Sequence, residues 1–316
     1  MVSFIVIGKN EGWRLEKCLS SIKYFVNQEN ISNYEVVYVD SKSTDNSIDI
    51  ARKYDVNTIL LVTGECNAAI GRNIGARNAK GNILFFIDGD MELLPGFWSS
   101  IVNDDKQLIY PFISGIERDI RHNNSWEYID TKIRRKHTKD KDSFEMAVGG
   151  LFAIQKKLWE AVGEMDNRLK VNEDIDLGIR LSKLGYRLCR KPQIWVNHYT
   201  VETGLRTNTL QAVKYTALLS RKHFFNIQAQ LIQFPKHYSS WMLCLCGIIS
   251  IVLWSFIPLV LYLFFPVYRT IRIKMRTPCA VNVLKTFYKA ILRDFLFLYH
   301  LITYFPITPS LEYKKV

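Results

Sequence analysis

Two carboxylates separated by one glycine follow directly after five consecutive apolar residues. The run from Ile83 to Ile87 has the pattern of a strand buried on both faces, and Asp88, Gly89 and Asp90 come next. Residues two apart in an extended segment point to the same side, so the two carboxylates can face one spot. Like charges placed together repel unless a cation lies beside them, and carboxylate oxygens suit Mg²⁺ or Mn²⁺. An Asp-Gly turn after a strand is the alternative interpretation.

Further polar side chains follow other predicted strands. Strand-like and helix-like segments alternate from the N-terminus to the strand at 83–87, which predicts an α/β fold with a mostly parallel, Rossmann-like sheet flanked by helices. Ligands of such sheets bind beyond the carboxyl ends of the strands. The residues at these ends include Asn10, Glu11, Asp40, Asp88 and Asp90. This grouping of polar residues predicts a binding site.

Composition narrows the classes of partner. The chain has 316 residues and a formal net charge of +12, which favours nucleotide diphosphates, phospholipid headgroups or nucleic acid. Its six cysteines are scattered without a CxxC pair, so we expect neither a disulfide framework nor a zinc site, and we expect the reducing cytosol. Residues 1–7 are too short for the core of a signal peptide and predict a strand instead.

The last third of the chain is more apolar and more basic. Apolar residues recur at helical spacing over 210–231, which fits a helix lying on a membrane or packing on the preceding domain. Residues 241–265 contain no charge, and as one helix they would extend about 37 Å, against about 30 Å for the hydrocarbon core of a bilayer. This run predicts membrane attachment.

The way in which this region meets the membrane stays open. Seven basic residues and no acid lie in 266–293, and basic loops prefer the cytoplasmic side. Pro258 could bend the charge-free run into a re-entrant hairpin, with 284–305 lying along the surface, or 284–305 could cross back. We favour the re-entrant or interfacial form. Anionic lipid explains these basic residues better than nucleic acid does, because they adjoin the apolar run.

Four motifs in order resemble the family-2 glycosyltransferases of GT-A fold. The resemblance extends to about His198 and implies a nucleotide-sugar donor. A Gln/Arg-x-x-Arg-Trp sequence, typical of the processive synthases, is absent, which favours the addition of a single sugar. The motifs are 4–7 with Asn10-Glu11, the segment 39–47, the segment 71–75, and Asp88-Gly89-Asp90.

The resemblance also implies roles at the donor site. Asp40 would bind the base or ribose, and Asn10 and Glu11 would line the same pocket. Arg72 would lie near the donor diphosphate, although an arginine on a helix is more often solvated. Asp88 would contact the ribose or water on the metal.

The metal and acceptor residues follow from the same resemblance. Asp90, with Asp88 and His198, would hold Mg²⁺ or Mn²⁺, although a lone histidine is usually structural. Gly149 and Gly150 would precede the strand that floors the acceptor site.

Glu173-Asp174 matches the family's ED motif, and we take Asp174 as the general base with Glu173 as the alternative. Favourable interaction of acids with the helix dipole would explain the same pattern without catalysis.

These inferences define the expected organisation. Residues 1–205 form the catalytic domain (1–100 for the donor, 101–205 for the acceptor), 206–240 an amphipathic connecting helix, and 241–316 a membrane-associated region. We expect a metal-dependent, inverting glycosyltransferase on the cytoplasmic face of the inner membrane, acting on a glycan or lipid-linked acceptor in cell-envelope polysaccharide assembly. A polyprenyl-phosphate sugar synthase and a non-catalytic membrane-bound scaffold are the alternatives. A sugar-nucleotidyltransferase is disfavoured, because it needs a glycine-rich basic loop after the first strand.

Overall fold

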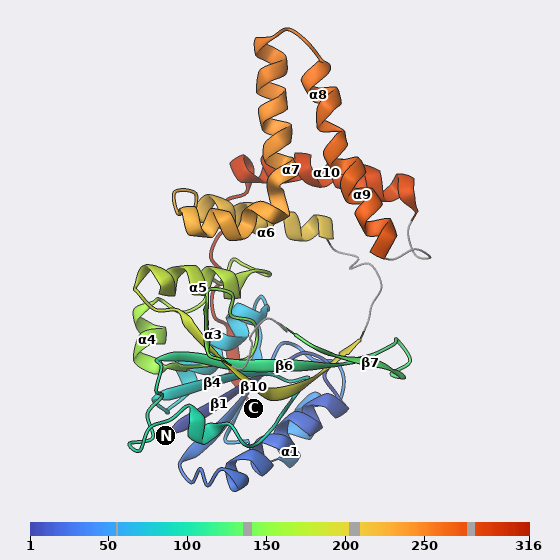
Figure 1. Ribbon diagram of the computed structural model, residues 1–316. Coiled ribbons are helices and arrows are strands. Elements are labelled where there is room, and N and C mark those ends of the chain that lie inside the picture. Colours follow the sequence, from blue (N-terminus) through green and yellow to red (C-terminus); the bar gives the residue numbers. More distant parts are fainter. Residues whose placement is uncertain (55, 135–140, 202–208, 277–281) are drawn as a thin grey trace. The chain divides into compact units, whose positions relative to one another are not determined.

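The computed structural model describes residues 1–54, 56–134, 141–201, 209–276 and 282–316. The chain forms two compact units (Figure 1). The first consists of residues 1–203 together with 308–316, and the second of residues 204–307.

The N-terminal half of the first unit is a parallel sheet with crossover helices, as the alternating pattern predicts. Its strands lie in the order β3-β2-β1-β4 and all pair in parallel. Alternate residues of β1 pack on opposite faces: Phe4 and Val6 belong to one buried apolar cluster, and Ile5 and Ile7 to the other. The elements are β1 (Val2–Gly8), α1 (Trp13–Gln28), β2 (Tyr34–Asp40), α2 (Ser47–Lys53), β3 (Thr58–Val62), α3 (Ala68–Asn78) and β4 (Ile83–Asp88).

The sheet continues with strands of both directions, so it is mixed rather than mostly parallel. Strand β9 runs antiparallel to both β4 and β6, β6 is parallel to β10, and β10 is antiparallel to β5. The added elements are β5 (Met91–Leu93), the 3-10 turn η1 (Trp98–Ser100), β6 (Phe112–His122), β7 (Tyr128–Ile133), β8 (Ser143–Glu145), β9 (Phe152–Gln155) and β10 (Leu188–Val201).

Register in this part of the sheet groups three distant segments. His198 of β10 is opposite Met91 of β5 on one side and opposite Asp119 of β6 on the other. Asp90, the residue before Met91, therefore lies near both His198 and Asp119.

Helix α5 (Glu173–Lys183) packs unusually close to the segment before β9, which itself is followed by α4 (Lys156–Ala161). A Cβ at Gly178 would lie 1.8 Å from the main-chain oxygen of Met146, so only glycine allows this approach. The close contact places the first turn of α5 beside Gly149.

The end of the chain returns to the first unit. Strand β11 (Tyr313–Lys315) pairs antiparallel with β3 and forms the edge of the sheet. The expected C-terminal region 241–316 is therefore divided, since residues 308–316 belong with the sheet. A segment as short and basic as Tyr313-Lys314-Lys315 carries no periodicity that would have indicated a strand.

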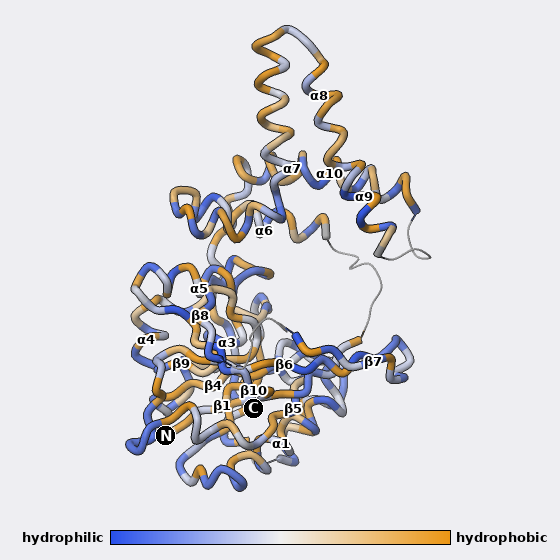
Figure 2. The backbone as a smooth tube through the Cα atoms, in the orientation of Figure 1, coloured by the Kyte–Doolittle hydropathy of each residue, from blue (hydrophilic) through white to orange (hydrophobic). Residues whose placement is uncertain are grey.

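The second unit is helical, and its charge-free run does not form one helix. The run is broken at residues 253–256, where α7 ends and the chain turns into α8 (Figures 1 and 2). Pro258 lies in the first turn of α8, where the missing N–H costs nothing. Among the described residues we find no helix with the length and apolarity needed to cross a membrane. The helices are α6 (Thr209–Lys222), α7 (Ile227–Val252), α8 (Ile257–Tyr262), α9 (Phe264–Arg276) and α10 (Val283–Thr303).

Candidate active site

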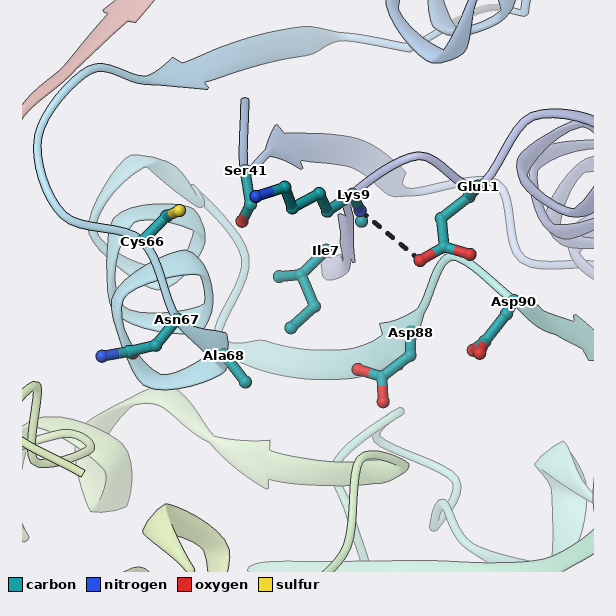
Figure 3. A pocket seen from close by; sticks show the side chains of 10 residues that line it. Ile7, Lys9, Glu11, Ser41, Cys66, Asn67, Ala68, Asp88 and Asp90 are labelled. Carbon is teal, nitrogen blue, oxygen red and sulfur yellow. Dashed lines mark hydrogen bonds between the residues drawn. The ribbon is translucent and has the colours of Figure 1, made fainter. Parts of the chain in front are cut away.

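A pocket of about 300 Å³ opens at the carboxyl ends of β1 and β4. Glu11, Asp88 and Asp90 lie on one side of it, and Cys66, Asn67 and Ala68 at the start of α3 lie on the other (Figure 3). Its lining consists of Ile7, Gly8, Lys9, Glu11, Ser41, Cys66, Asn67, Ala68, Asp88 and Asp90.

Arg72 of α3 connects this pocket to α5. Its side chain is 3% exposed, which excludes the solvated alternative. One guanidinium nitrogen lies 2.7 Å from Asp88 Oδ1 and the other 3.3 Å from Glu173 Oε1. Burial by itself would lower the pKa of Arg72, but the two carboxylates outweigh it and hold the pKa above its usual value. The charge of Arg72 therefore holds together one acid of β4, Asp88, and one acid of α5, Glu173.

Asp40 and Asn10 hold the loops of the pocket rather than lining it. Asp40 is fully buried and accepts hydrogen bonds from Tyr38 Oη (2.9 Å) and the main-chain N–H of Ser43 (2.7 Å). Asn10 Oδ1 accepts from the N–H of Thr44 at 2.7 Å. Both oxygens of Asp40 are thus engaged, one by Tyr38 of β2 and one by the loop that follows, and the neighbouring Ser41 lines the pocket instead.

Glu11 faces the acidic side of the pocket. Arg14, one turn later, lies 2.6 Å from its Oε2. Burial, followed by repulsion from Asp90, raises the pKa of Glu11 to about 7 in spite of this arginine. The carboxyl group of Glu11 therefore lies in a crowded acidic corner.

His198 lies between two carboxylates. It belongs to β10, which lies beside β6 in the sheet (Figure 1). Its Nδ1 is 2.9 Å from Asp119 Oδ1 and its Nε2 is 3.2 Å from Asp90 Oδ2. Burial by itself would lower the pKa of His198, but the hydrogen bonds to Asp119 and Asp90 raise it to about 10. The structure brings together Asp90 and His198, as the sequence analysis expects, and adds Asp119.

The side-chain oxygen and nitrogen atoms of Asp90 and His198 are suitable ligands for a hard divalent cation. Asp90 Oδ1 is buried and has no hydrogen-bond partner among the described residues. Carboxylate oxygens with one imidazole nitrogen suit Mn²⁺ and tolerate Mg²⁺.

A second group of acidic residues lies next to Asp90 and shares His198 with it. Glu117, Asp119 and His198 offer ligand atoms within 4.8 Å of one another. The guanidinium of Arg134 already lies 2.9 Å from Glu117 and 2.7 Å from Asp119, so a cation bound there would meet its positive charge. Arg14 Nη1 likewise lies 3.6 Å from Asp90 Oδ2, so an arginine adjoins both groups. The buried Oδ1 of Asp90, which has no hydrogen-bond partner among the described residues, is the feature that favours Asp90 with His198 as the cation site.

The residues predicted for the acceptor site, Gly149 and Gly150, lie next to Asp174 and Asp88. The N–H of Gly149 donates to Asp174 Oδ2 at 2.9 Å. A Cβ at Gly150 would lie 2.2 Å from Asp88 Oδ2, so the missing side chain is what admits Asp88. Burial raises the pKa of Glu173, although Arg72 opposes the shift.

The sequence analysis missed the residues of β6. Glu117 and Asp119 are two apart in an extended strand, which is the same signal that identified Asp88 and Asp90. This signal was overlooked because the acids interrupt a strand whose apolar part ends at Ile116.

Comparisons with known proteins identify relatives of the chain. A protein of Haemophilus influenzae named as an uncharacterized glycosyltransferase is 25% identical over 254 residues, which cover 76% of this chain and 82% of that protein. A protein of Methanococcus voltae, named dolichyl N-acetyl-alpha-D-glucosaminyl phosphate 3-beta-D-2,3-diacetamido-2,3-dideoxy-beta-D-glucuronosyltransferase, is 26% identical over 253 residues, covering 72% of this chain and 76% of the relative.

A solved structure of similar fold and a family model also match this chain. A crystal structure of GalNAc-T7 with UDP, GalNAc and Mn²⁺ aligns with a TM-score of 0.54 at 19% identity, covering 70% of this chain and 47% of that one. The likeness at this identity concerns the fold alone. The family model described as glycosyl transferase family 2 matches residues 3–162, half of the chain. The chain is therefore an enzyme of glycosyltransferase family 2.

Proposed function

We propose that this enzyme transfers one sugar from a nucleotide-sugar donor to a hydroxyl of a glycan or lipid-linked acceptor, with inversion and with the help of a divalent cation. The observation that carries the proposal is the bridge from Asp88 through Arg72 to Glu173. This bridge connects Asp88 of the pocket to Glu173 in the first turn of α5, where the predicted base Asp174 is the next residue, and it supports a single site for donor and acceptor.

The donor pocket has chemistry that suits a nucleoside diphosphate. The carboxylates of Glu11 and Asp88 can accept hydrogen bonds from ribose hydroxyls, and the buried charge of Arg72 lies behind Asp88. Arg72 Nε is buried and has no hydrogen-bond partner among the described residues. A donor phosphate would supply both the missing acceptor and a negative charge.

Asp90 and His198 would hold Mn²⁺ or Mg²⁺, with Asp88 beside them. When bound, such a cation stabilises negative charge on the departing diphosphate. Asp119 would position His198, because a carboxylate on Nδ1 keeps the proton on that nitrogen, and Nε2 would bind a metal after losing the proton that it shares with Asp90. The GalNAc-T7 structure, which contains UDP and Mn²⁺, supports the choice of donor and metal.

Asp174 would act as the general base towards the acceptor hydroxyl. The N–H of Gly149 fixes one of its oxygens, whereas Glu173 is engaged with Arg72. One base and one direct attack on the anomeric carbon imply inversion of configuration. Glu173 remains the alternative base.

Lipid-linked acceptors and the cytoplasmic face of the inner membrane belong to the same proposal, in cell-envelope polysaccharide assembly. The Methanococcus voltae relative is named for a dolichyl phosphate acceptor, which supports this choice. A polyprenyl-phosphate sugar synthase would use the same site and leave a sugar monophosphate lipid as product, so product analysis separates the two. A non-catalytic scaffold would form no glycosidic product with any donor.

The donor class and the metal are tested together by thermal unfolding with UDP-, GDP- and dTDP-sugars, each with and without Mn²⁺. We expect one nucleotide class to raise the Tm by roughly 5–10 °C at a concentration about 100 times its Kd. The part of the shift that depends on Mn²⁺ should disappear in Asp90→Ala. The control Asp49→Ala removes a carboxylate that is 70% exposed on α2 and should leave the shift intact. An unchanged Mn²⁺ effect in Asp90→Ala would remove the metal assignment.

The positioning role of Asp119 has its own readout. In Asp119→Asn the Mn²⁺ concentration for half-maximal activity should rise roughly 10- to 100-fold, with kcat recovered at saturating Mn²⁺. The control Glu127→Gln changes an exposed acid in the turn between β6 and β7, and this variant should behave as the wild type. A loss of kcat that saturating Mn²⁺ does not repair would argue against this role.

Arg72→Gln should destabilise the first unit. Removing one partner of a buried ion pair costs about 3–5 kcal/mol of unfolding free energy, and we expect the lower end because Asp88 is 31% exposed. Arg77→Gln breaks an ion pair of the same helix whose arginine is 57% exposed, and it should cost under about 1 kcal/mol. Equal losses in denaturant unfolding would show that Arg72 does not hold the site together.

Separate variants of the ED pair assign the base. Asp174→Asn should lower kcat by roughly 10²- to 10⁴-fold, the usual contribution of a general base, without a matching change in donor KM. Glu173→Gln should have the smaller effect on kcat. The opposite order, measured under donor saturation, would transfer the role to Glu173.

A further inference from the structure

The second unit carries almost all of the net charge of the chain. Residues 204–307 contain twelve lysines and arginines and a single acid, Asp294, whereas the whole chain has a formal charge of +12. The first unit, which carries the candidate active site, therefore has a net charge close to zero. Such segregation is unrelated to the pocket described above, and it indicates an anionic partner for the helices.

The single acid is withdrawn from the surface into the helix packing. Asp294 of α10 is fully buried and accepts hydrogen bonds from Ser239 Oγ, Ser240 Oγ and Tyr262 Oη, each at 2.9 Å. Arg269 of α9 lies 3.3 Å from its Oδ1. This network joins α7, α8, α9 and α10, so the base of the α7–α8 pair is fixed, and the surface of the unit presents no carboxylate.

Beyond this network, α7 and α8 form a hairpin with an apolar end (Figures 1 and 2). Trp254 is 96% exposed, Phe256 82% and Ile251 76%. Exposed apolar residues this dense mark a binding surface rather than an ordinary soluble one. The hairpin tip, as we define it, consists of the exposed residues Ile251, Val252, Leu253, Trp254, Phe256, Ile257, Val260 and Leu261.

The reach of the hairpin fits one leaflet of a bilayer. From Ser240 in the buried network to Leu253 at the turn there are thirteen residues, or about 20 Å of helix. The hydrocarbon core is about 30 Å thick, so the tip would pass the headgroups and stop near the midplane.

A cavity in the hairpin has the lining that a hydrocarbon chain needs. It measures about 420 Å³ and is bordered by residues of α7, the turn and α8. Water would gain few hydrogen bonds there, whereas a lipid tail would bury apolar surface. The lining residues are Gly247, Ser250, Ile251, Trp254, Ser255, Phe256 and Leu259.

Basic residues surround the base of the hairpin. Arg272 of α9 and Lys285 and Lys289 of α10 are exposed, as is Lys236 of α7. A second copy of this chain would bring the same positive charges against each other, whereas an anionic lipid surface neutralises them. Charge complementarity therefore favours the lipid surface over self-association.

We propose that the hairpin tip inserts into one leaflet of a bilayer containing anionic phospholipids, while α9 and α10 contact the headgroups. The protein then binds the membrane from one side without crossing it. The test is independent of the enzymatic proposal, because it uses neither donor nor acceptor.

The experiment is flotation of the full chain with vesicles of phosphatidylcholine alone or of equal parts phosphatidylcholine and phosphatidylglycerol. We expect binding to the mixed vesicles, and a loss of at least about 10-fold in the tip variant Trp254→Ser/Phe256→Ser. Tyr24→Ser on α1, which removes a 55% exposed aromatic residue of the catalytic unit, is the matched control and should bind as the wild type. Lys285→Gln and Lys289→Gln should each weaken binding to the mixed vesicles by roughly fivefold.

Two results would overturn the proposal. One is wild-type vesicle binding by the tip variant, confirmed folded by thermal unfolding. The other is no vesicle binding together with a dimer in sedimentation that the tip variant dissociates, because the tip would then be an interface between copies of the chain.

Discussion

The ion bridge through Arg72 is the interaction on which the catalytic unit depends. A guanidinium that is 3% exposed is costly to bury unless carboxylates surround it, and here Asp88 and Glu173 do so from two different elements. The converse also holds, since these acids would repel each other without the arginine. Each charge is tolerable in the interior only because the others are present, so α3, β4 and α5 are held in one arrangement.

This constraint links structural stability with the proposed chemistry. The first turn of α5 carries both the acid that pairs with Arg72 and the neighbouring Asp174, which receives the N–H of Gly149. Two glycines make that packing possible, because a side chain at Gly150 would collide with Asp88 and one at Gly178 with the backbone at Met146. Asp88 and the first turn of α5 are thus positioned by the same few contacts.

The two units separate two physical tasks. The first unit buries its charges in pairs around a pocket, and the second exposes apolar side chains and unbalanced positive charge. Asp294 is consistent with this division, since the only acid of the second unit serves its interior packing. The proposed contact with an anionic lipid surface rests on this distribution of charge.

Local sequence was sufficient for much of the first unit. Asp88 and Asp90 both line the pocket, but β4 ends at Asp88 and Gly89-Asp90 forms a turn, so the alternative interpretation as an Asp-Gly turn describes the backbone there. The apolar runs and the residues that follow them predicted β1 to β4 and their crossover helices. These features depend on side-chain alternation within one segment, which is visible without knowing the fold. The family motifs likewise drew attention to Arg72, His198 and the ED pair.

Only the tertiary structure could decide the remainder. Asp119 reaches His198 through the register of β6 and β10, which are distant in sequence. Asp40 is buried, and its two oxygens are satisfied by Tyr38 of the same strand and by the N–H of Ser43. The charge-free run was long enough for a spanning helix, but the chain reverses at residues 253–256, where it turns into α8. The sequence pattern thus indicated which segments are apolar and which residues carry charge. Contacts between distant segments decided where they meet, because pairing and packing energies depend on neighbours that one segment does not contain.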